Sequence, residues 1–353
     1  MSPPDPTPAG ATPGQASRGA PDVPTDRPTF WFVGVTTGAS SIMSVFPAWA
    51  GHLGLGDVAM RGIDLPLRAP RAAYREVVEY IRHDPLSRGA LVTTHKLDLY
   101  AACTDLFDEV DGFARTMRET SCLSRRDGRL VCHAKDPITS GLAMERFLEP
   151  GHFERTGAEA FAIGAGGSAI ALTWSLTRPE RGADRPSRVV VSDVSEERLD
   201  EIRRVHRELD AGVPCEYVHA TDVADNDRVL GTLPPGSLVV NATGLGKDAP
   251  GSPLGPGARF PERAVAWDLN YRGELVFLDQ ARAQRDARSL RVEDGWIYFI
   301  HGWTRVMAEV FDVEIPTEGP GFEALSRIAA EAGRPTPGPT PGTTGGNAGA
   351  STP

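Results

Sequence analysis

The sequence predicts an α/β protein with two domains, and three observations lead to this expectation. The chain has 353 residues, which is about twice the length of a typical single domain. Short apolar runs alternate with amphipathic helical stretches over most of that length, and this alternation is typical of α/β folds. A glycine-rich turn joins one such strand to one such helix in the second half of the chain.

Composition and charge exclude several classes of protein. Lys and Arg total 37 against 47 Asp and Glu, and the net charge of −10 argues against nucleic acid or an anionic membrane surface as the main partner. No apolar run approaches the roughly 20 residues that span a bilayer, and the polar, Pro-rich start lacks the layout of a secretory signal. We therefore expect a soluble, cytoplasmic protein.

Cysteine and histidine patterns point away from metal and hydrolase chemistry. The four cysteines (Cys103, Cys122, Cys132 and Cys215) are too few and too scattered for a disulfide scaffold or a zinc ribbon. The eight histidines contain no H-x-x-x-H pair, and no G-x-S-x-G motif occurs. We expect no metal site and no serine nucleophile.

Both ends of the chain are expected to be disordered tails. Residues 1–28 contain eight prolines and almost no large apolar side chain, and residues 334–353 are rich in Pro, Gly and Thr, so neither can bury enough apolar area to offset its ordering entropy. The folded body is divided into a first domain over 29–145, a second over 146–290, and C-terminal helices over 291–333 that return to the first domain.

The elements of the first domain follow from runs of apolar residues between polar or glycine-containing segments. Strands are expected at residues 29–35, 89–93 and 129–133. Helices are expected at residues 45–53, 96–103 and 139–148.

In the second domain the alternation of strand and helix is clearer. Strands are expected at residues 160–163, 188–192, 237–241 and 263–269. Helices are expected at residues 168–176, 196–209 and 275–282, with a last helix at 302–311 in the returning segment.

The run GAGGSA at residues 164–169 has the spacing G-x-G-x-x-A of a dinucleotide-binding turn. Gly164 allows the tight turn, Gly166 lets the backbone approach a pyrophosphate, and Ala169 permits close packing of helix on strand. The free N–H groups of the following helix would face the anion. An ordinary glycine-rich strand-to-helix turn is the alternative. The candidate cofactor contacts here are Gly164, Ala165, Gly166 and Gly167.

The strand after this turn ends at Asp193, where a carboxylate can accept hydrogen bonds from an adenosine ribose. Such a carboxylate favours NAD, because it would repel the additional phosphate of NADP. The polar insert 178–187 explains why Asp193 lies further from the turn than the usual 20 or so residues. The alternative is that Asp193 caps the next helix. Asp222 follows a further short strand and is interpreted as a loop residue, with a place near an adenine as the alternative.

Seven short segments carry a resemblance to a known family. In chain order they are GVTTGASSIMS (34–44), LVTTHK (91–96), AKDP (134–137), GAGG (164–167), NAT (241–243), DLNY (268–271) and DGWIYFIHG (294–302). Over most of residues 30–320 the chain thereby resembles the shikimate/quinate dehydrogenase family. The resemblance implies that 29–145 is a substrate-binding catalytic domain, that 146–290 is a Rossmann-type doubly wound parallel sheet, and that the active site lies between them.

The resemblance also implies a reaction. A hydride would pass between a nicotinamide (NAD preferred, NADP the alternative) and a ring hydroxyl or ketone of a shikimate- or quinate-like cyclohexane carboxylate. The partner would be a small cyclic hydroxy acid, and a homodimer is left open. Lys96 and Asp136 match the family's proton-transfer pair. A lysine can accept the hydroxyl proton while a carboxylate orients it and balances its charge. The alternatives are a surface lysine at a helix start and a turn aspartate before proline.

Substrate and cofactor roles carry over residue by residue. Ser40, Thr93, Tyr271 and His301 match substrate positions, while Asn241 and Thr243 match cofactor positions. Ile42 stands at the second serine of the substrate loop unless Ser41 or Ser44 replaces it, and either His301 or Gly302 stands at a family glutamine, depending on one gap. Leu91 and Ala134 each stand where the family has an asparagine, and Lys135 stands at a family threonine. The family's proline before His-Lys is either replaced by Thr94 or deleted.

These departures fall on groups that would grip the carboxylate and ring hydroxyls. Since buried polar groups left unpaired discriminate strongly between substrates, we expect an altered substrate. The alternative function is a dinucleotide-binding sensor or regulatory protein with the same fold.

Overall fold

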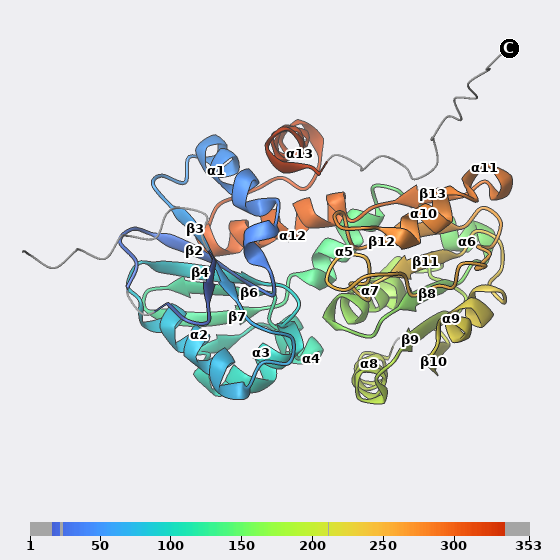
Figure 1. The fold of residues 1–353 in the computed structure, drawn as a ribbon, viewed down its shortest axis with the longest axis horizontal. Helices are drawn as coiled ribbons and strands as arrows, with labels where there is room; N and C mark the ends of the chain where they lie inside the picture. Colours follow the sequence, from blue (N-terminus) through green and yellow to red (C-terminus); the bar gives the residue numbers. More distant parts are fainter. Residues whose placement is uncertain (1–15, 22–23, 211, 336–353) are drawn as a thin grey trace, which may run out of the picture.

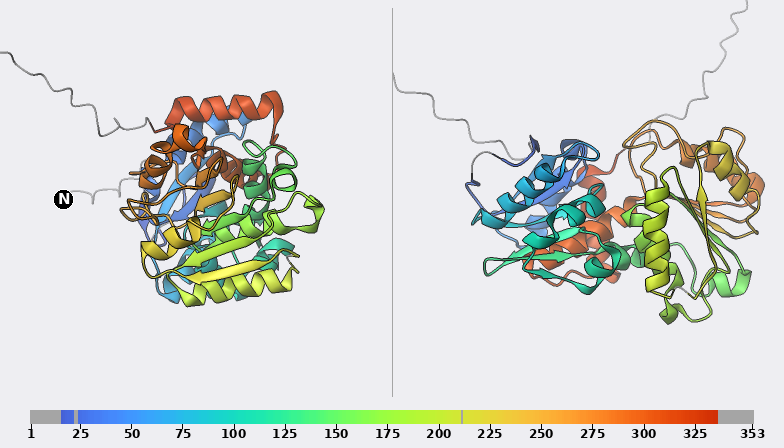
Figure 2. Two further views of the ribbon diagram at one scale, coloured as in Figure 1. Left: turned by 90° about the vertical axis from the view of Figure 1, so that its right-hand side faces the viewer. Right: turned by 90° about the horizontal axis from the view of Figure 1, so that it is seen from below.

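The computed structural model describes residues 16–21, 24–210 and 212–335. Two β-sheets lie in separate halves of the molecule (Figure 1). The halves are also distinct in the view from below, in the right-hand panel of Figure 2. The predicted mixed α/β class with two sheets is therefore confirmed.

The first sheet has seven strands in the order β1-β3-β2-β4-β6-β7-β5. In chain order they are β1 (Ala16–Arg18), β2 (Thr29–Gly34), β3 (Ala59–Asp64), β4 (Ser87–Val92), β5 (Glu109–Val110), β6 (Cys122–Arg126) and β7 (Arg129–His133). Neighbouring strands are parallel except for β6, which is antiparallel to β4 and β7. The connecting helices are α1 (Ile42–Leu53), α2 (Arg71–His83), α3 (Lys96–Cys103) and α4 (Gly112–Met117).

Apolar side chains cover both faces of this sheet. Along β2, Phe30 and Phe32 point into one buried cluster, while Trp31 and Val33 point into another. A strand with both faces buried reads as a continuous apolar run, which is why residues 29–35 were recognisable from sequence. The first cluster lies under α1, and the second lies under α2 and α3.

The second sheet has six parallel strands in the order β10-β9-β8-β11-β12-β13. They are β8 (Ala160–Ile163), β9 (Val189–Asp193), β10 (Cys215–His219), β11 (Leu238–Asn241), β12 (Val265–Asp268) and β13 (Arg291–Glu293). The accompanying helices are α7 (Gly167–Thr177), α8 (Glu196–Glu208), α9 (Val223–Leu230), α10 (Val276–Arg282) and α11 (Arg285–Arg288). This is the strand order of a Rossmann sheet, with the switch point between β8 and β11.

Four further helices complete the fold. They are α5 (Asp136–Met144), α6 (His152–Thr156), α12 (Trp296–Phe311) and α13 (Gly319–Gly333). α5 packs against both α7 and α12. α12 lies on β4 and β6, and α13 lies on α1 (Figure 1). The C-terminal helices therefore pack on the first half of the chain; the boundary near residue 145 remains a prediction.

Several element boundaries differ from the expected ones. α5 begins at Asp136 and ends at Met144, earlier than the expected 139–148, because Pro137 is accommodated in the first turn of a helix, where its missing N–H has no role. α12 begins at Trp296, six residues before the expected 302. An aromatic run there concealed the start of the helix.

The expectation of disorder for residues 1–28 needs a correction. Ala16–Arg18 forms β1, which pairs in parallel with Gly62–Asp64 of β3, and the Thr25 hydroxyl donates to Asp84 at 2.8 Å. Edge pairing uses backbone groups, so a polar, Pro-rich composition does not prevent it. The remainder of the expected tails, residues 1–15 and 336–353, lies outside the described residues.

Candidate active site

Lys96 and Asp136 meet at the carboxyl ends of the strands of the first sheet. Lys96 is the first residue of α3, shortly after β4, and Asp136 is the first residue of α5, shortly after β7. The Lys96 Nζ contacts Asp136 Oδ2 directly. The two side chains are only 13% and 10% exposed, so the pair is shielded from water. The structure thus brings together the two residues that the sequence singled out for proton transfer.

One carboxylate oxygen of this pair receives three donors. Besides Lys96, the Ser168 hydroxyl donates to Asp136 Oδ2 at 3.2 Å, and the Tyr298 hydroxyl donates at 2.9 Å. Lys96 Nζ also donates to Ser168 Oγ at 3.3 Å. Ser168 belongs to α7 and Tyr298 to α12. The cluster therefore connects the first sheet, the glycine-rich turn and the returning helix.

Burial and charge act in opposite directions on the lysine. Burial alone would lower the pKa of the Lys96 ammonium, but the neighbouring charge of Asp136 outweighs it, and the pKa is raised. Burial, followed by the Asp136 charge, also raises the pKa of the Tyr298 hydroxyl. Lys96 is therefore a stable ammonium that can donate a proton, and Tyr298 stays neutral and donates its hydrogen bond.

Ser40, Thr93 and Tyr271 line one cavity of about 90 Å³. Ser40 Oγ lies 3.4 Å from the Tyr271 hydroxyl oxygen. The loop before Ser40 is fixed by Asp64, which accepts from the Thr37 hydroxyl at 2.6 Å and from its backbone N–H at 2.8 Å. The other lining residues include the aromatic side chains of Phe32, Phe299 and Trp303, the charged side chains of Lys247, Asp248 and Arg272, and also Val35, Thr36 and Thr94.

His301 does not line this cavity. Its ring is fully buried and stacks on Phe322 of α13, with the ring centroids 4.4 Å apart. Burial lowers the pKa of His301 to about 3, so the ring is neutral. Phe299 and Trp303 lie one helical turn apart on α12 and face the cavity instead.

The glycine-rich turn has the shape that a dinucleotide phosphate requires. Gly164 has φ 104°, and a Cβ there would lie 2.9 Å from the carbonyl of Ala242, so only glycine fits against the end of β11. A Cβ on Gly166 would meet nothing within 4 Å, which leaves the surface before α7 open. The first N–H groups of α7 have no acceptor within the helix. These residues fit a pyrophosphate at the start of α7.

Asp193, the last residue of β9, is held against the turn. Its carboxylate accepts from Ala165 N at 2.7 Å and from Ser195 N at 2.8 Å. The cap of α8 is Ser195, whose hydroxyl accepts from Arg198 N, so Asp193 is not itself the N-cap residue. Asp222 is the N-cap of α9, in a capping box with Asp225.

Asn241 and Thr243 organise the end of β11. Asn241 is fully buried; its amide donates to Asp268 Oδ2 at 3.1 Å, and its oxygen accepts from the Thr243 hydroxyl at 2.7 Å. Burial raises the pKa of Asp268 to about 7. In this arrangement both side chains hold the strand end beside Gly164.

Sequence reasoning missed four polar residues of this region. Ser168 lies inside the turn motif and Tyr298 inside the segment 294–302, but neither position has a polar role in the pattern used for the resemblance. Lys247 and Arg272 follow the strand ends at β11 and β12. Of the four residues, only Arg272 had a signal in the sequence, because it directly follows Tyr271, a position already assigned to the substrate.

No family model matches the chain, but curated relatives do. The chain is 25% identical over 178 residues to the shikimate dehydrogenase (NADP(+)) of Lactococcus lactis, a match that covers 50% of this chain and 59% of that protein. It is 25% identical over 247 residues to the shikimate dehydrogenase (NADP(+)) of Streptococcus thermophilus, covering 70% of this chain and 81% of that protein. The chain thus spans less than two thirds of the Lactococcus enzyme.

Solved structures match over a larger part of the chain. Shikimate dehydrogenase from Aquifex aeolicus superposes with a TM-score of 0.64 at 16% identity, covering 87% of this chain and 99% of that one. Quinate dehydrogenase from Corynebacterium glutamicum in complex with NAD gives a TM-score of 0.61 at 18% identity, covering 87% and 100%. Shikimate 5-dehydrogenase from Thermus thermophilus, in complex with NADP(H) and shikimate, gives 0.58 at 22% identity, covering 86% and 99%.

The fold and the turn define a two-domain protein with a Rossmann sheet and a second α/β domain. Within that class, the comparisons confirm the resemblance to the shikimate/quinate dehydrogenase family. No helix in the described part of the chain is long and apolar enough to cross a membrane. Among the same residues, no cluster of metal-ligating side chains occurs.

Proposed function

We propose that this protein is an NAD(P)-dependent oxidoreductase that transfers a hydride between nicotinamide and a ring hydroxyl or ketone of a shikimate- or quinate-like cyclohexane carboxylate. The observation that carries the proposal is the buried contact of Lys96 with Asp136, linked to the dinucleotide turn through Ser168. The curated relatives are named shikimate dehydrogenases, which supports the reaction class.

Gly164 to Gly167 would hold the pyrophosphate of a dinucleotide, whose nicotinamide ring would supply or accept the hydride. Lys96, held as an ammonium, donates its proton to the ketone oxygen as that oxygen gains negative charge. In the opposite direction the neutral amine accepts the hydroxyl proton. Asp136 keeps Nζ in position and balances its charge, and Ser168 and Tyr298 fix the carboxylate in turn.

The small number of lysines in the chain also supports the assignment of Lys96 as the proton donor. The chain has three lysines, at positions 96, 135 and 247, among 37 basic residues. A lysine can exchange its proton whereas an arginine remains charged. One of the three contacts Asp136, and another lines the cavity with Ser40 and Tyr271.

The cavity suits a cyclic carboxylic acid. Ser40, Thr93 and Tyr271 offer hydroxyl groups for ring oxygens, while Lys247 and Arg272 offer cationic donors for a carboxylate. Phe299 and Trp303 give apolar surface for the ring carbons. We propose that Lys247 and Arg272 replace polar groups that are missing at Leu91 and Ala134.

NAD is proposed as the preferred cofactor. Asp193 lies at the end of β9, with Glu196 and Glu197 in the first turn of α8, and this negative charge would repel a ribose phosphate. Arg198, the next cation along the chain, is paired with Asp98 at 2.9 Å. The curated relatives are named for NADP, so this preference would be a departure from them. The dinucleotide-binding sensor has no support from these relatives, which are named as enzymes.

Nicotinamide absorbance tests the proposal. NAD and NADP are offered separately with quinate, shikimate and their amino and dehydro relatives, and turnover with one of them is expected. Lys96→Ala should lower kcat by about 10²-fold or more, the usual size of a general acid–base contribution. Lys135→Ala is the matched control, since Lys135 Nζ binds Glu309 at 2.7 Å and not the pair. Turnover by Lys96→Ala within a few-fold of the parent would contradict the assignment, and dinucleotide binding without turnover would favour the sensor.

A further inference from the structure

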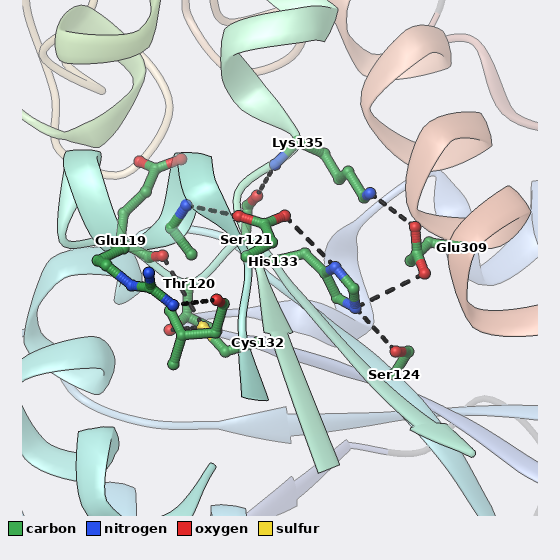
Figure 3. A network of polar contacts seen from close by, with 12 residues as sticks. Glu119, Thr120, Ser121, Ser124, Cys132, His133, Lys135 and Glu309 are labelled. Carbon is green, nitrogen blue, oxygen red and sulfur yellow. Dashed lines mark hydrogen bonds and ion pairs between the residues drawn. The ribbon is translucent and has the colours of Figure 1, made fainter. Parts of the chain in front are cut away.

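Glu119, which lies between α4 and β6, is a buried carboxyl without a partner. The residue is 0% exposed, and neither side-chain oxygen has a hydrogen-bond partner within the described residues. Figure 3 shows the carboxyl directed away from the neighbouring Thr120–Cys132 contact, with no dashed line reaching it. Burying an unpaired carboxyl is costly, so its presence beside a reactive centre calls for a role.

The Glu119 carboxyl is packed between the dinucleotide turn and Lys96. A Cβ on Gly167 would lie 2.3 Å from Glu119 Oε2 and 3.5 Å from Lys96 Cδ, so both groups border the same small space. The backbone fixes this neighbourhood, because Thr120 N donates to Lys96 O at 3.0 Å. The Glu119 carboxyl therefore lies next to Gly167, the first residue of α7, and close to the Lys96 side chain.

Several charges bear on this carboxyl, and they come from three elements. Burial raises the pKa of Glu119 to about 8, with a further contribution from Asp136 at the start of α5, whereas Lys96 at the start of α3 acts to lower it. Asp111, the N-cap of α4, also raises it. At neutral pH the group therefore carries a proton.

We propose that Glu119 recharges Lys96 during the reaction, and this inference rests on the proposed function. When Lys96 gives its proton to the substrate oxygen, it becomes a neutral amine. Neither Glu119 oxygen is hydrogen-bonded to Lys96 Nζ in the resting state, so the Glu119 carboxylic acid transfers its proton to that amine across one intervening water, which leaves an ammonium and a carboxylate. The carboxylate takes up a proton from solvent before the next turnover. In the oxidation direction the same transfers run in reverse. Glu119 contacts no substrate and acts only through Lys96.

Glu119→Gln tests this role, because it keeps the shape of the side chain and removes the titrating proton. In the reduction direction, kcat at pH 7 is expected to fall about tenfold or more while KM stays within about threefold. The parent's kcat should decline above about pH 8, and this step should be absent from the variant. Glu119→Asp, which retains an acid, should recover part of the activity.

Glu309→Gln is the matched control. This half-buried carboxyl is bound to Lys135 (Figure 3), and its loss should leave the pH profile of kcat unchanged. An identical pH profile and kcat for Glu119→Gln and the parent would overturn the role of Glu119.

A readout without turnover separates this inference from the proposed function. Infrared difference spectra between pH 6.5 and 9.5 should contain a carboxylic acid C=O band in the parent that is lost in Glu119→Gln, while the band of Asp268, whose pKa is raised to about 7, remains in both proteins. If the band is missing in the parent, Glu119 holds no proton and the inference fails, whether or not the protein is a dehydrogenase. If the band is present but no substrate is turned over, the proposed function fails. The role of Glu119 in recharging Lys96 then fails as well, because it depends on that function.

Discussion

At the scale of single residues, the site depends on one oxygen atom. Asp136 Oδ2 accepts from Lys96, Ser168 and Tyr298, and each donor comes from a different helix. A carboxylate held by three donors has little freedom to rotate, so the Lys96 ammonium is held in one place. Of these donors, Tyr298 is the most informative to change, because its hydroxyl can be removed without altering the ring.

Tyr298→Phe should lower kcat/KM by roughly tenfold to a hundredfold. Hydrogen bonds to charged groups are worth about 1.5–3 kcal/mol, and a factor of ten corresponds to about 1.4 kcal/mol. Dinucleotide affinity, measured by fluorescence titration, should stay unchanged because Tyr298 lies outside the turn. Tyr217→Phe is the control. Tyr217 lies on the edge strand β10, and its hydroxyl oxygen is 2.8 Å from Nδ1 of His206 on α8. Equal kcat/KM values for the two variants would show that the Tyr298 hydroxyl is dispensable.

Two adjacent glycines of the turn should respond differently to alanine. At Gly167 a Cβ would meet Glu119 Oε2 at 2.3 Å, whereas at Gly166 it would meet nothing within 4 Å. Gly167→Ala should therefore destabilise the protein by about 1–3 kcal/mol through overpacking, and Glu119→Ala in the same chain should restore part of that loss. Gly166→Ala should keep its melting temperature but bind dinucleotide more weakly. Thermal unfolding and dinucleotide titration of Gly166→Ala, Gly167→Ala, Glu119→Ala and the double variant test both statements. Additive losses in the double variant would contradict the predicted contact.

At the scale of elements, α12 and α13 cover one face of the first sheet together with α1. Trp49 of α1 donates to the Leu325 carbonyl of α13 at 2.8 Å, and Phe322 of α13 stacks on His301 of α12. His301 has no hydrogen-bond partner for either ring nitrogen within the described residues. The interface of the two helices therefore contains a titratable ring that can be accommodated only when it is neutral.

His301→Leu should make the protein less sensitive to acid. The pKa of His301 is lowered to about 3, below the value of about 6.5 in an unfolded chain, so as the pH falls the unfolded chain binds the proton first. Stability is then full above about pH 6.5 and declines towards pH 3, and this one group costs about 2 kcal/mol at pH 5. Urea unfolding at pH 8 and pH 5 should give a smaller drop for the variant than for the parent. Equal drops would show that the ring is not buried in the neutral form.

The same elements indicate how far sequence reasoning can reach. Strands such as Ala160–Ile163 and Arg129–His133 were predicted to the residue, because apolar runs bounded by glycine or polar residues leave few alternatives. The pair Lys96 and Asp136 was found mainly because the segments 91–96 and 134–137 resemble those of the shikimate/quinate dehydrogenase family, with the strand end before Lys96 as a supporting observation. His301 was assigned to the substrate although it faces α13, since a resemblance in sequence gives the position along a helix but not which face it presents. Glu119 had no sequence signal, because its environment is formed by four separate segments.

At the scale of the whole molecule, the two halves are coupled through contacts between their helices. α5 packs on both α7 and α12, and Ser168 ties the dinucleotide turn to Lys96 and Asp136. A ligand at the turn therefore acts on both halves, and its binding free energy should appear in the stability of the entire chain. A ligand at one hundred times its Kd stabilises the folded state by about 2.7 kcal/mol.

This coupling gives a test of cofactor preference that needs no substrate. At equal concentrations NAD should raise the melting temperature more than NADP, because Asp193 at the end of β9 disfavours the additional ribose phosphate of NADP. Ala165 N donates to Asp193 Oδ2 and Ser195 N donates to Oδ1, so Asp193→Asn keeps an acceptor for one of the two and removes the negative charge. The difference between the two cofactors should therefore shrink. Asp222→Asn is the matched control, since it neutralises an N-cap carboxylate at the start of α9. A larger rise in melting temperature with NADP in the parent would contradict the proposed preference for NAD. Asp193 would then serve only to hold the turn through its hydrogen bonds to Ala165 N and Ser195 N.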